Sequence, residues 1–159
     1  MLFDTFNIGN NYKQKHMRKI LFVWLSMLIG LHAVAQSNQN IIGKWKTIDD
    51  ETGDAKSIVE VFQKADGKYY GKISKLLVKP ENDKCIQCKD DRKNQPLLGL
   101  EIIRGITKKG DEFSGGTITD PKNGKTYKCT ITREGNKLLV RGYVGFSLIG
   151  RTQTWQLAN

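Results

Sequence analysis

Beyond residue 40, apolar and polar side chains alternate in short runs rich in β-branched and aromatic residues. In one such run Tyr127, Cys129 and Ile131 share one face, whereas Lys128 and Thr130 point to the other. Alternation with a period of two gives a strand one dry and one wet face, which is typical of antiparallel sheets. The pattern predicts β-strands, with almost no stretch of helical period.

Clusters of Gly, Asn and Asp, residues that tolerate the positive φ of tight turns, separate the runs. The strands are predicted at residues 42–49, 57–64, 68–77, 99–107, 112–119, 125–133, 137–144 and 152–158. Eight strands joined by hairpins predict an all-β fold, an antiparallel up-and-down eight-stranded β-barrel that exposes no sheet edge. Such a barrel either fills with side chains or holds one small ligand.

An apolar segment precedes the first strand. Residues 17–35 begin with Arg18 and Lys19, continue with an apolar run at 20–31, and end in an Ala-x-Ala site at 33–35. This is the pattern of a secretory signal peptide. The apolar run of about 12 residues is shorter than the roughly 20 needed for a membrane-spanning helix. We therefore expect a periplasmic or secreted protein without a transmembrane anchor in the mature chain.

The signal peptide divides the chain into three parts. Residues 1–16 are polar and precede a better start at Met17, so we interpret them as a mis-assigned N-terminal extension. Residues 36–159 then form one mature domain, long enough for a genuine core. Without residues 1–35 the net charge falls from +10 to +7. No nucleic-acid-binding motif accompanies this charge, so we expect no nucleic-acid partner.

Both histidines, His16 and His32, lie before residue 36. Their absence from the mature chain excludes Ser-His-Asp and Cys-His catalysis and the usual His-containing zinc sites. We expect neither an enzyme nor a bound metal or cofactor. The acidic residues at 49–54 could form an acid/base pair or a calcium site. However, the calcium-loop spacing is absent and the cluster favours a solvated turn.

Cys85 and Cys88 lie in the longest irregular stretch, residues 79–95. In an exported protein this CxxC pair is expected to close as a local disulfide. Half a metal site and a redox pair remain alternatives. Cys129 lies on the apolar face of its strand and is predicted to be a small buried hydrophobe. Pairing of Cys129 with Cys85 or Cys88 also stays open.

The first and last strands pair in a closed barrel. Trp45 is predicted to plug one end, with Arg151 as the first candidate to stack on its indole and Arg141 as the second. The predicted interior wall comprises Trp45, Val59, Val61, Tyr69, Ile73, Tyr127, Ile131, Val140 and Trp155. For a hollow barrel the candidate ligand-binding residues are Trp45, Tyr69, Tyr127, Arg141, Arg151 and Trp155.

Several motifs resemble a known family. Gly43-Lys44-Trp45 matches the G-x-W signature of lipocalin-like (calycin) barrels. The further motifs are Pro96-Leu97-Leu98-Gly99-Leu100, Gly115-Gly116, Asp120-Pro121-x-x-Gly124-Lys125-x-Tyr127, Leu138-x-Val140-Arg141-Gly142-Tyr143-x-Gly145 and Gly150-Arg151-Thr152-Gln153-x-Trp155. Over roughly residues 43–157 the chain resembles the DUF2147 family of exported bacterial proteins. The resemblance implies a small exported β-barrel domain, and it implies no reaction, because the function of that family is unknown.

Two functions follow as hypotheses. The first is a non-catalytic binding module of the cell envelope that holds a small apolar or amphiphilic ligand in its barrel. The alternative is a structural or protein-interaction component of the envelope with a filled barrel. Its partner would bind the charged stretch 79–95 and exposed aromatics such as Tyr70 and Tyr143. A cavity of about 300 Å³ or more would favour the first hypothesis.

Overall fold

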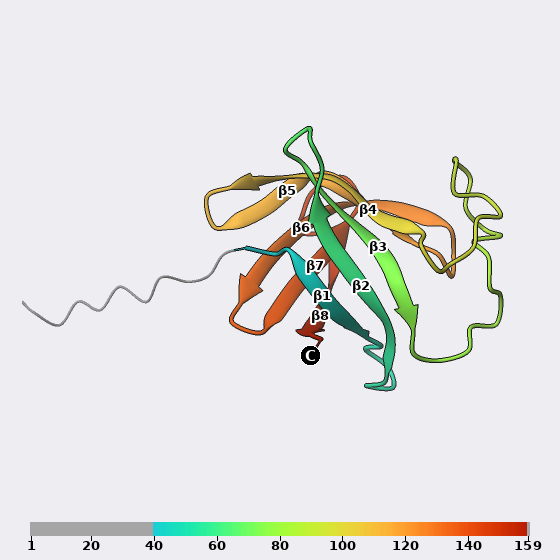
Figure 1. Cartoon of the computed structure of the whole chain (residues 1–159). Helices are drawn as coiled ribbons and strands as arrows, with labels where there is room; N and C mark the ends of the chain where they lie inside the picture. Colours follow the sequence, from blue (N-terminus) through green and yellow to red (C-terminus); the bar gives the residue numbers. More distant parts are fainter. Residues whose placement is uncertain (1–39, 159) are drawn as a thin grey trace, which may run out of the picture. The chain divides into compact units, whose positions relative to one another are not determined.

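The computed structural model describes residues 40–158. The predicted signal peptide and N-terminal extension lie outside the described residues. The described chain forms eight strands (Figure 1), namely β1 (Gly43–Ile48), β2 (Ala55–Gln63), β3 (Tyr69–Leu76), β4 (Glu101–Lys109), β5 (Glu112–Asp120), β6 (Lys125–Glu134), β7 (Lys137–Tyr143) and β8 (Gly150–Leu157). Every strand was predicted, and each observed end lies within two residues of the predicted one.

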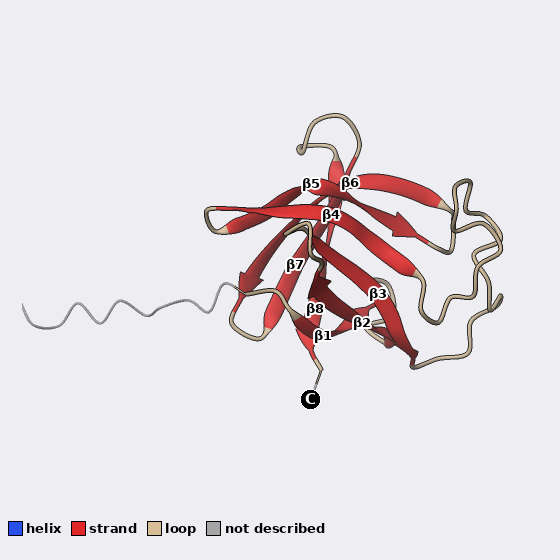
Figure 2. Cartoon of the chain, turned by 45° about the horizontal axis from the view of Figure 1, so that its top comes forward, coloured by secondary structure: helices blue, strands red, loops and turns tan. Residues whose placement is uncertain are grey.

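The strands pair antiparallel in chain order, and β1 closes the barrel by pairing with β8. Trp45 of β1 lies opposite Leu157 of β8. The predicted fold class, an antiparallel up-and-down eight-stranded barrel, is therefore confirmed. Figure 2 shows strands and loops only in the described part of the chain, where no helix is long and apolar enough to cross a membrane.

The connections between strands gather at two ends. The connections at residues 49–54, 77–100, 121–124 and 144–149 define what we call the mouth end. The short turns at 64–68, 110–111 and 135–136, together with the chain before β1, lie at the opposite end, the plug end. In Figure 1 the long β3–β4 connection, drawn in yellow-green, lies beside the β5–β6 turn at the mouth end. Three of the four mouth-end connections are longer than any turn of the plug end.

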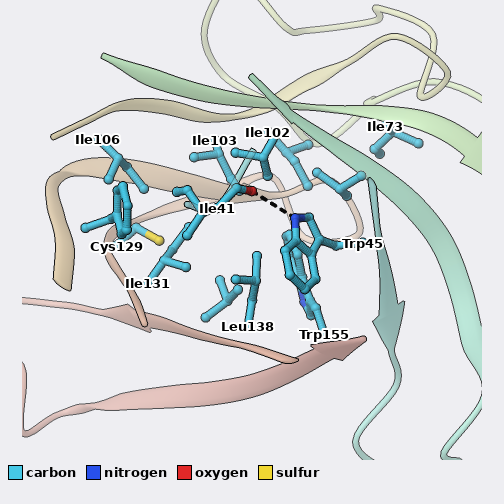
Figure 3. Close-up of a cluster of buried hydrophobic side chains, with 14 of the residues drawn as sticks. Ile41, Trp45, Ile73, Ile102, Ile103, Ile106, Cys129, Ile131, Leu138 and Trp155 are labelled. Atoms are coloured by element: carbon cyan, nitrogen blue, oxygen red, sulfur yellow. Dashed lines mark hydrogen bonds between the residues drawn. The ribbon is translucent and has the colours of Figure 1, made fainter. Parts of the chain in front are cut away.

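Trp45 seals the plug end. Its side chain is fully buried, and its indole N–H donates a hydrogen bond of 2.9 Å to the carbonyl of Ile41 (Figure 3). The guanidinium of Arg133 lies 5.2 Å from the centre of the indole ring and also donates to the carbonyl of Asn40. Such cation–π stacking holds the chain before β1 across the end of the barrel.

The prediction that Arg151 or Arg141 stacks on Trp45 is wrong. Both arginines lie on the halves of β7 and β8 that approach the mouth end, whereas Arg133 is the second-last residue of β6 and lies beside the plug. Strand direction explains the difference: β6 runs toward the plug end, so Arg133 near its end reaches the indole although β6 does not pair with β1.

Apolar side chains fill the barrel between the plug and its middle. Tyr69 packs edge-on against Phe113, with ring centres 5.0 Å apart. The other buried members of this filling are Ile41, Trp45, Val61, Ile106, Ile131 and Leu138. Because its large side chains are closely packed, the plug half forms the stable core of the barrel.

Cys129 is fully buried on the inner face of β6 and has no disulfide partner. The alternative that it pairs with Cys85 or Cys88 is therefore wrong. Burial raises the pKa of its thiol to about 12, because the thiolate would lose its hydration. We expect no reaction with a disulfide-forming thiol reagent in the native protein and one reactive thiol per chain in denaturant. One rapidly reacting thiol in the native protein would contradict this placement.

Candidate ligand cavity

The barrel is hollow in its mouth half. A cavity of about 650 Å³ begins beneath the connections of the mouth end and reaches Trp155 on β8. Its volume lies within the range of small-molecule sites, which begins near 300 Å³. The plug half is filled and the mouth half is open. The sequence left open a filled or a hollow barrel, and the interior combines the two.

Apolar side chains form the deep wall of the cavity. Ile73, Ile102, Val140 and Trp155 are all buried and line it. They come from β3, β4, β7 and β8, so the wall surrounds the cavity on several sides. A wall of this kind favours an aliphatic or aromatic portion of a ligand, since burial of apolar surface is favourable.

Gly142 leaves part of this space empty. A Cβ atom at this position would lie 3.4 Å from Cβ of Tyr127 and 3.5 Å from Cγ2 of Ile118, both of which line the cavity. Gly142 follows the inward-facing Val140 by two residues on β7, so alternation turns it inward as well. A larger residue here would project into the cavity.

Polar groups lie on one side of the cavity. The hydroxyl oxygens of Thr47 and Ser57 are 2.8 Å apart, and the hydroxyl of Thr47 also accepts from the Ser57 amide. On β8, Gln153 accepts a hydrogen bond from the indole of Trp155 at 3.4 Å. These neutral groups can orient a ligand without placing a charge in the interior.

Charged side chains surround the entrance. Asp50 and Arg151 form an ion pair of 2.7 Å across the β1–β2 connection and the start of β8. The Asp49 carboxylate accepts from the amides of Thr52 and Glu51. The Thr52 amide, with that of Glu51, lowers the pKa of Asp49 below 3.8. These carboxylates are thus held by turn amides and a guanidinium, and the described residues contain no cluster that could hold a metal ion.

A family model described as "Uncharacterized protein conserved in bacteria (DUF2147)" matches residues 43–157. The chain belongs to the DUF2147 family. The match runs from the start of β1 to the end of β8, so the whole barrel is the family domain.

A solved structure has the same fold as this DUF2147 barrel. It is the protein HP1028 from Helicobacter pylori, described as belonging to the lipocalin family. The TM-score is 0.65 at 20% sequence identity, and the alignment covers 76% of this chain and 84% of that one. At this identity the likeness shows a lipocalin-like fold and nothing about the ligand. No curated protein matches the chain.

The DUF2147 barrel brings only some of the candidate ligand-binding residues together. Tyr127, Arg151 and Trp155 line the cavity. Trp45 and Tyr69 belong to the filled plug half instead. Their large side chains face inward as expected, but they lie below the empty volume.

Placing Arg141 in the barrel interior was wrong. Val140 faces inward, so its neighbour Arg141 points outward, where its guanidinium donates to the carbonyls of Ser147 and Leu148. Gly142, Thr47, Ser57 and Gln153 were missed. An interior strand glycine on an inward-facing position was the available signal, since such glycines often mark close approach or empty space.

Three buried residues, Cys85, Cys88 and Arg92, anchor the stretch 79–95, whereas most of its other residues are exposed. The predicted disulfide between Cys85 and Cys88 is confirmed, and both residues are buried. Arg92 is 3% exposed, and its guanidinium donates to the Asp90 carboxylate and to the Glu101 carbonyl. A buried guanidinium needs such partners, because an unpaired buried charge is costly.

The outer surface carries a further ion pair, and the two tyrosines that were expected to be exposed there are less exposed than predicted. Asp91 accepts two hydrogen bonds from Arg104 of β4, at 2.7 and 2.8 Å. Tyr70 and Tyr143, expected to be exposed, are both half-buried. Tyr70 donates to Asp66 and carries the ammonium of Lys64 over its ring, so its outer-face position already has partners.

The Asp90–Arg92 pair predicts a pH dependence of the stretch 79–95. The Arg92 guanidinium lowers the pKa of Asp90 from 3.8 to about 2. A carboxyl whose pKa is lower in the folded state stabilises that state fully above about pH 3.8, and this contribution is lost as the pH falls through about 2. Asp90 is 44% exposed, so solvent screening makes the effect modest.

We expect amide hydrogen-exchange protection at residues 85–95 to fall between about pH 4 and about pH 2, where Asp90 takes up its proton. Asp90→Asn should lower protection near neutral pH and weaken its dependence on pH in this window. An unchanged pH profile in Asp90→Asn would contradict the role of this ion pair.

Proposed function

We propose that this DUF2147 chain is an exported, non-catalytic binding protein of the cell envelope, which holds a small apolar or amphiphilic ligand in its mouth-half cavity. The observation that carries the proposal is a cavity of about 650 Å³ with a buried apolar wall and a charged entrance. An interior of this kind suits one small molecule better than a protein segment. The signal pattern at residues 17–35 supports export to the periplasm or beyond.

The distribution of polarity supports an amphiphile with its tail inside. Ile73, Val140 and Trp155 offer apolar contacts at depth, and the polar group then lies near the ion pair of Asp50 and Arg151. Either sign of ligand charge finds a partner at this entrance. The absence of histidine after residue 35 and the low pKa of Asp49 both support binding over acid–base catalysis.

The test is a titration with a fluorescent fatty acid, using protein produced from the full chain in an exporting bacterium. We expect saturable, one-to-one binding that quenches Trp155. Gly142→Leu should weaken binding by about tenfold or more, because its side chain occupies the space of the ligand. Gln156→Leu adds the same side chain to the exposed outer face of β8 and should leave the affinity unchanged.

Native folding of Gly142→Leu is checked by the protection of Cys129 from thiol reagents. If Gly142→Leu does not fold, Ile118→Phe fills the cavity from β5 and takes its place. Equal fatty-acid affinity in the folded cavity-filling variant and the unmodified protein would overturn the proposal. The mass of the same preparation tests export, since loss of residues 1–35 is expected.

A further inference from the structure

Exposed apolar side chains gather around the entrance of the cavity. Most large hydrophobic residues that are exposed in the described chain belong to connections of the mouth end, namely Leu77, Val78, Ile86, Leu98, Val144, Phe146, Leu148 and Ile149. The turns of the plug end, at 64–68, 110–111 and 135–136, instead consist of charged, polar or small residues. Apolar exposure of this kind often marks a contact surface for a membrane or a partner.

The β7–β8 connection, residues 144–149, is the most exposed part of this surface. Phe146 is 82% exposed, Leu148 90% and Ile149 72%. The connection contains no charged residue. Exposure this high means that the side chains project from the barrel with few neighbours. A projecting apolar tip fits insertion into a deformable medium better than docking against a flat protein face.

Four backbone carbonyls of this connection already accept hydrogen bonds within the protein. Arg141 donates to the carbonyls of Ser147 and Leu148, at 2.6 to 3.3 Å. The carbonyls of Phe146 and Ile149 accept from amides within the same connection. Backbone groups that enter a bilayer must be satisfied internally, because no water is available there. Arg141 thus supplies partners that water would otherwise provide.

The connection is continuous with the cavity. Val144 and Ile149 line the cavity entrance, whereas Phe146 and Leu148 are exposed and do not line it. We propose that residues 144–149 insert into the surface of a lipid bilayer and hold the mouth of the barrel against it. An amphiphile then passes between bilayer and cavity with its tail shielded from water. This inference rests on the proposed function, and it names a lipid surface as the partner of the mouth end.

The entrance carries both signs of charge, as in the pair of Asp50 and Arg151. Apolar insertion, rather than attraction to anionic lipid, is therefore the expected source of affinity. Binding to vesicles of phosphatidylcholine alone should be measurable and should persist at high salt, which screens charge interactions but not burial of apolar surface. Binding that requires anionic lipid and disappears at high salt would overturn the inference.

The experiment measures co-sedimentation of the protein, produced from the full chain in an exporting host, with phosphatidylcholine vesicles. Phe146→Ser combined with Leu148→Ser should lower the partition coefficient by about tenfold or more, since two large apolar side chains no longer insert. The control, Ile42→Ser, removes an exposed apolar residue from the plug end and should change the partition coefficient less than about twofold. All variants share the same N-terminal residues, so differences between them report only the substitutions.

The fatty-acid titration separates this inference from the proposed function. The Phe146 and Leu148 double variant should keep the affinity for soluble fatty acid, because neither residue lines the cavity. Gly142→Leu should lose fatty-acid binding and keep vesicle binding. No vesicle binding by the unmodified protein, or equal vesicle binding by the double variant, would overturn membrane docking alone. Association of the protein with itself through residues 144–149, without vesicle binding, would likewise overturn it.

Discussion

Trp45→Ala is expected to lower the free energy of unfolding by about 3–5 kcal/mol, the range for removing a large buried aromatic side chain. Trp45 is fully buried, and its indole N–H bonds to the Ile41 carbonyl. Its ring also carries the guanidinium of Arg133. The substitution therefore opens a void, removes a hydrogen bond and releases the chain segment that crosses the plug end.

Trp155→Ala is the matched comparison. Trp155 is also buried, but it lines the existing cavity, and its indole hydrogen bond of 3.4 Å is longer. Fewer packed neighbours are lost there, so we expect a smaller decrease in stability. Urea unfolding followed by circular dichroism measures both variants. A decrease for Trp45→Ala no larger than that for Trp155→Ala would contradict the assignment of Trp45 as the plug.

Gly124→Ala should have the second large effect. Gly124 has a φ of +68°, and a Cβ atom there would lie 1.9 Å from the carbonyl oxygen of Gln87. The stretch 79–95 therefore packs directly on the β5–β6 turn, and any side chain at Gly124 forces it away. Left-handed strain and overpacking together predict a loss of about 2–5 kcal/mol.

Gly135→Ala separates the two causes. Gly135 has a similar φ of +58°, but a Cβ atom there would meet nothing within 4 Å, so only the backbone cost of about 1–2 kcal/mol is expected. Displacement of 79–95 should also expose the disulfide of Cys85 and Cys88. We expect faster reduction by a soluble phosphine in Gly124→Ala and an unchanged rate in Gly135→Ala. Equal stability losses and equal reduction rates in Gly124→Ala and Gly135→Ala would show that the close approach of Gly124 to Gln87 does not contribute to stability.

The strands were predictable because their signals are local. Inward residues such as Tyr127, Cys129 and Ile131 recur with the period of a strand, and turn residues separate the runs. The same alternation, applied strictly to Val140 and Arg141, would also have placed Arg141 on the outer face. Closure of the barrel followed from the number of strands and the absence of helical period.

The site was harder to predict because it depends on residues far apart in the chain. The partner of Trp45 depends on where each strand begins and ends: Arg133 lies near the plug-end terminus of β6, whereas Arg151 lies at the mouth-end start of β8. The cavity depends on the sum of inward side-chain volumes. Gly142 lowers that sum, but in the sequence pattern a glycine only weakens the strand prediction and does not indicate a cavity. The packing of 79–95 on Gly124 joins segments that no local pattern connects.

The most direct measurement of ligand position is photo-crosslinking with a fatty acid that carries a diazirine at the end of its tail, mapped by mass spectrometry. A tail held in the mouth-half cavity should label the cavity lining, with adducts at Tyr127, Val140 or Trp155 that a competing fatty acid removes. Gly142→Leu should abolish these adducts. Labelling confined to the outer face of the barrel, or no competed labelling at all, would contradict ligand binding inside the barrel.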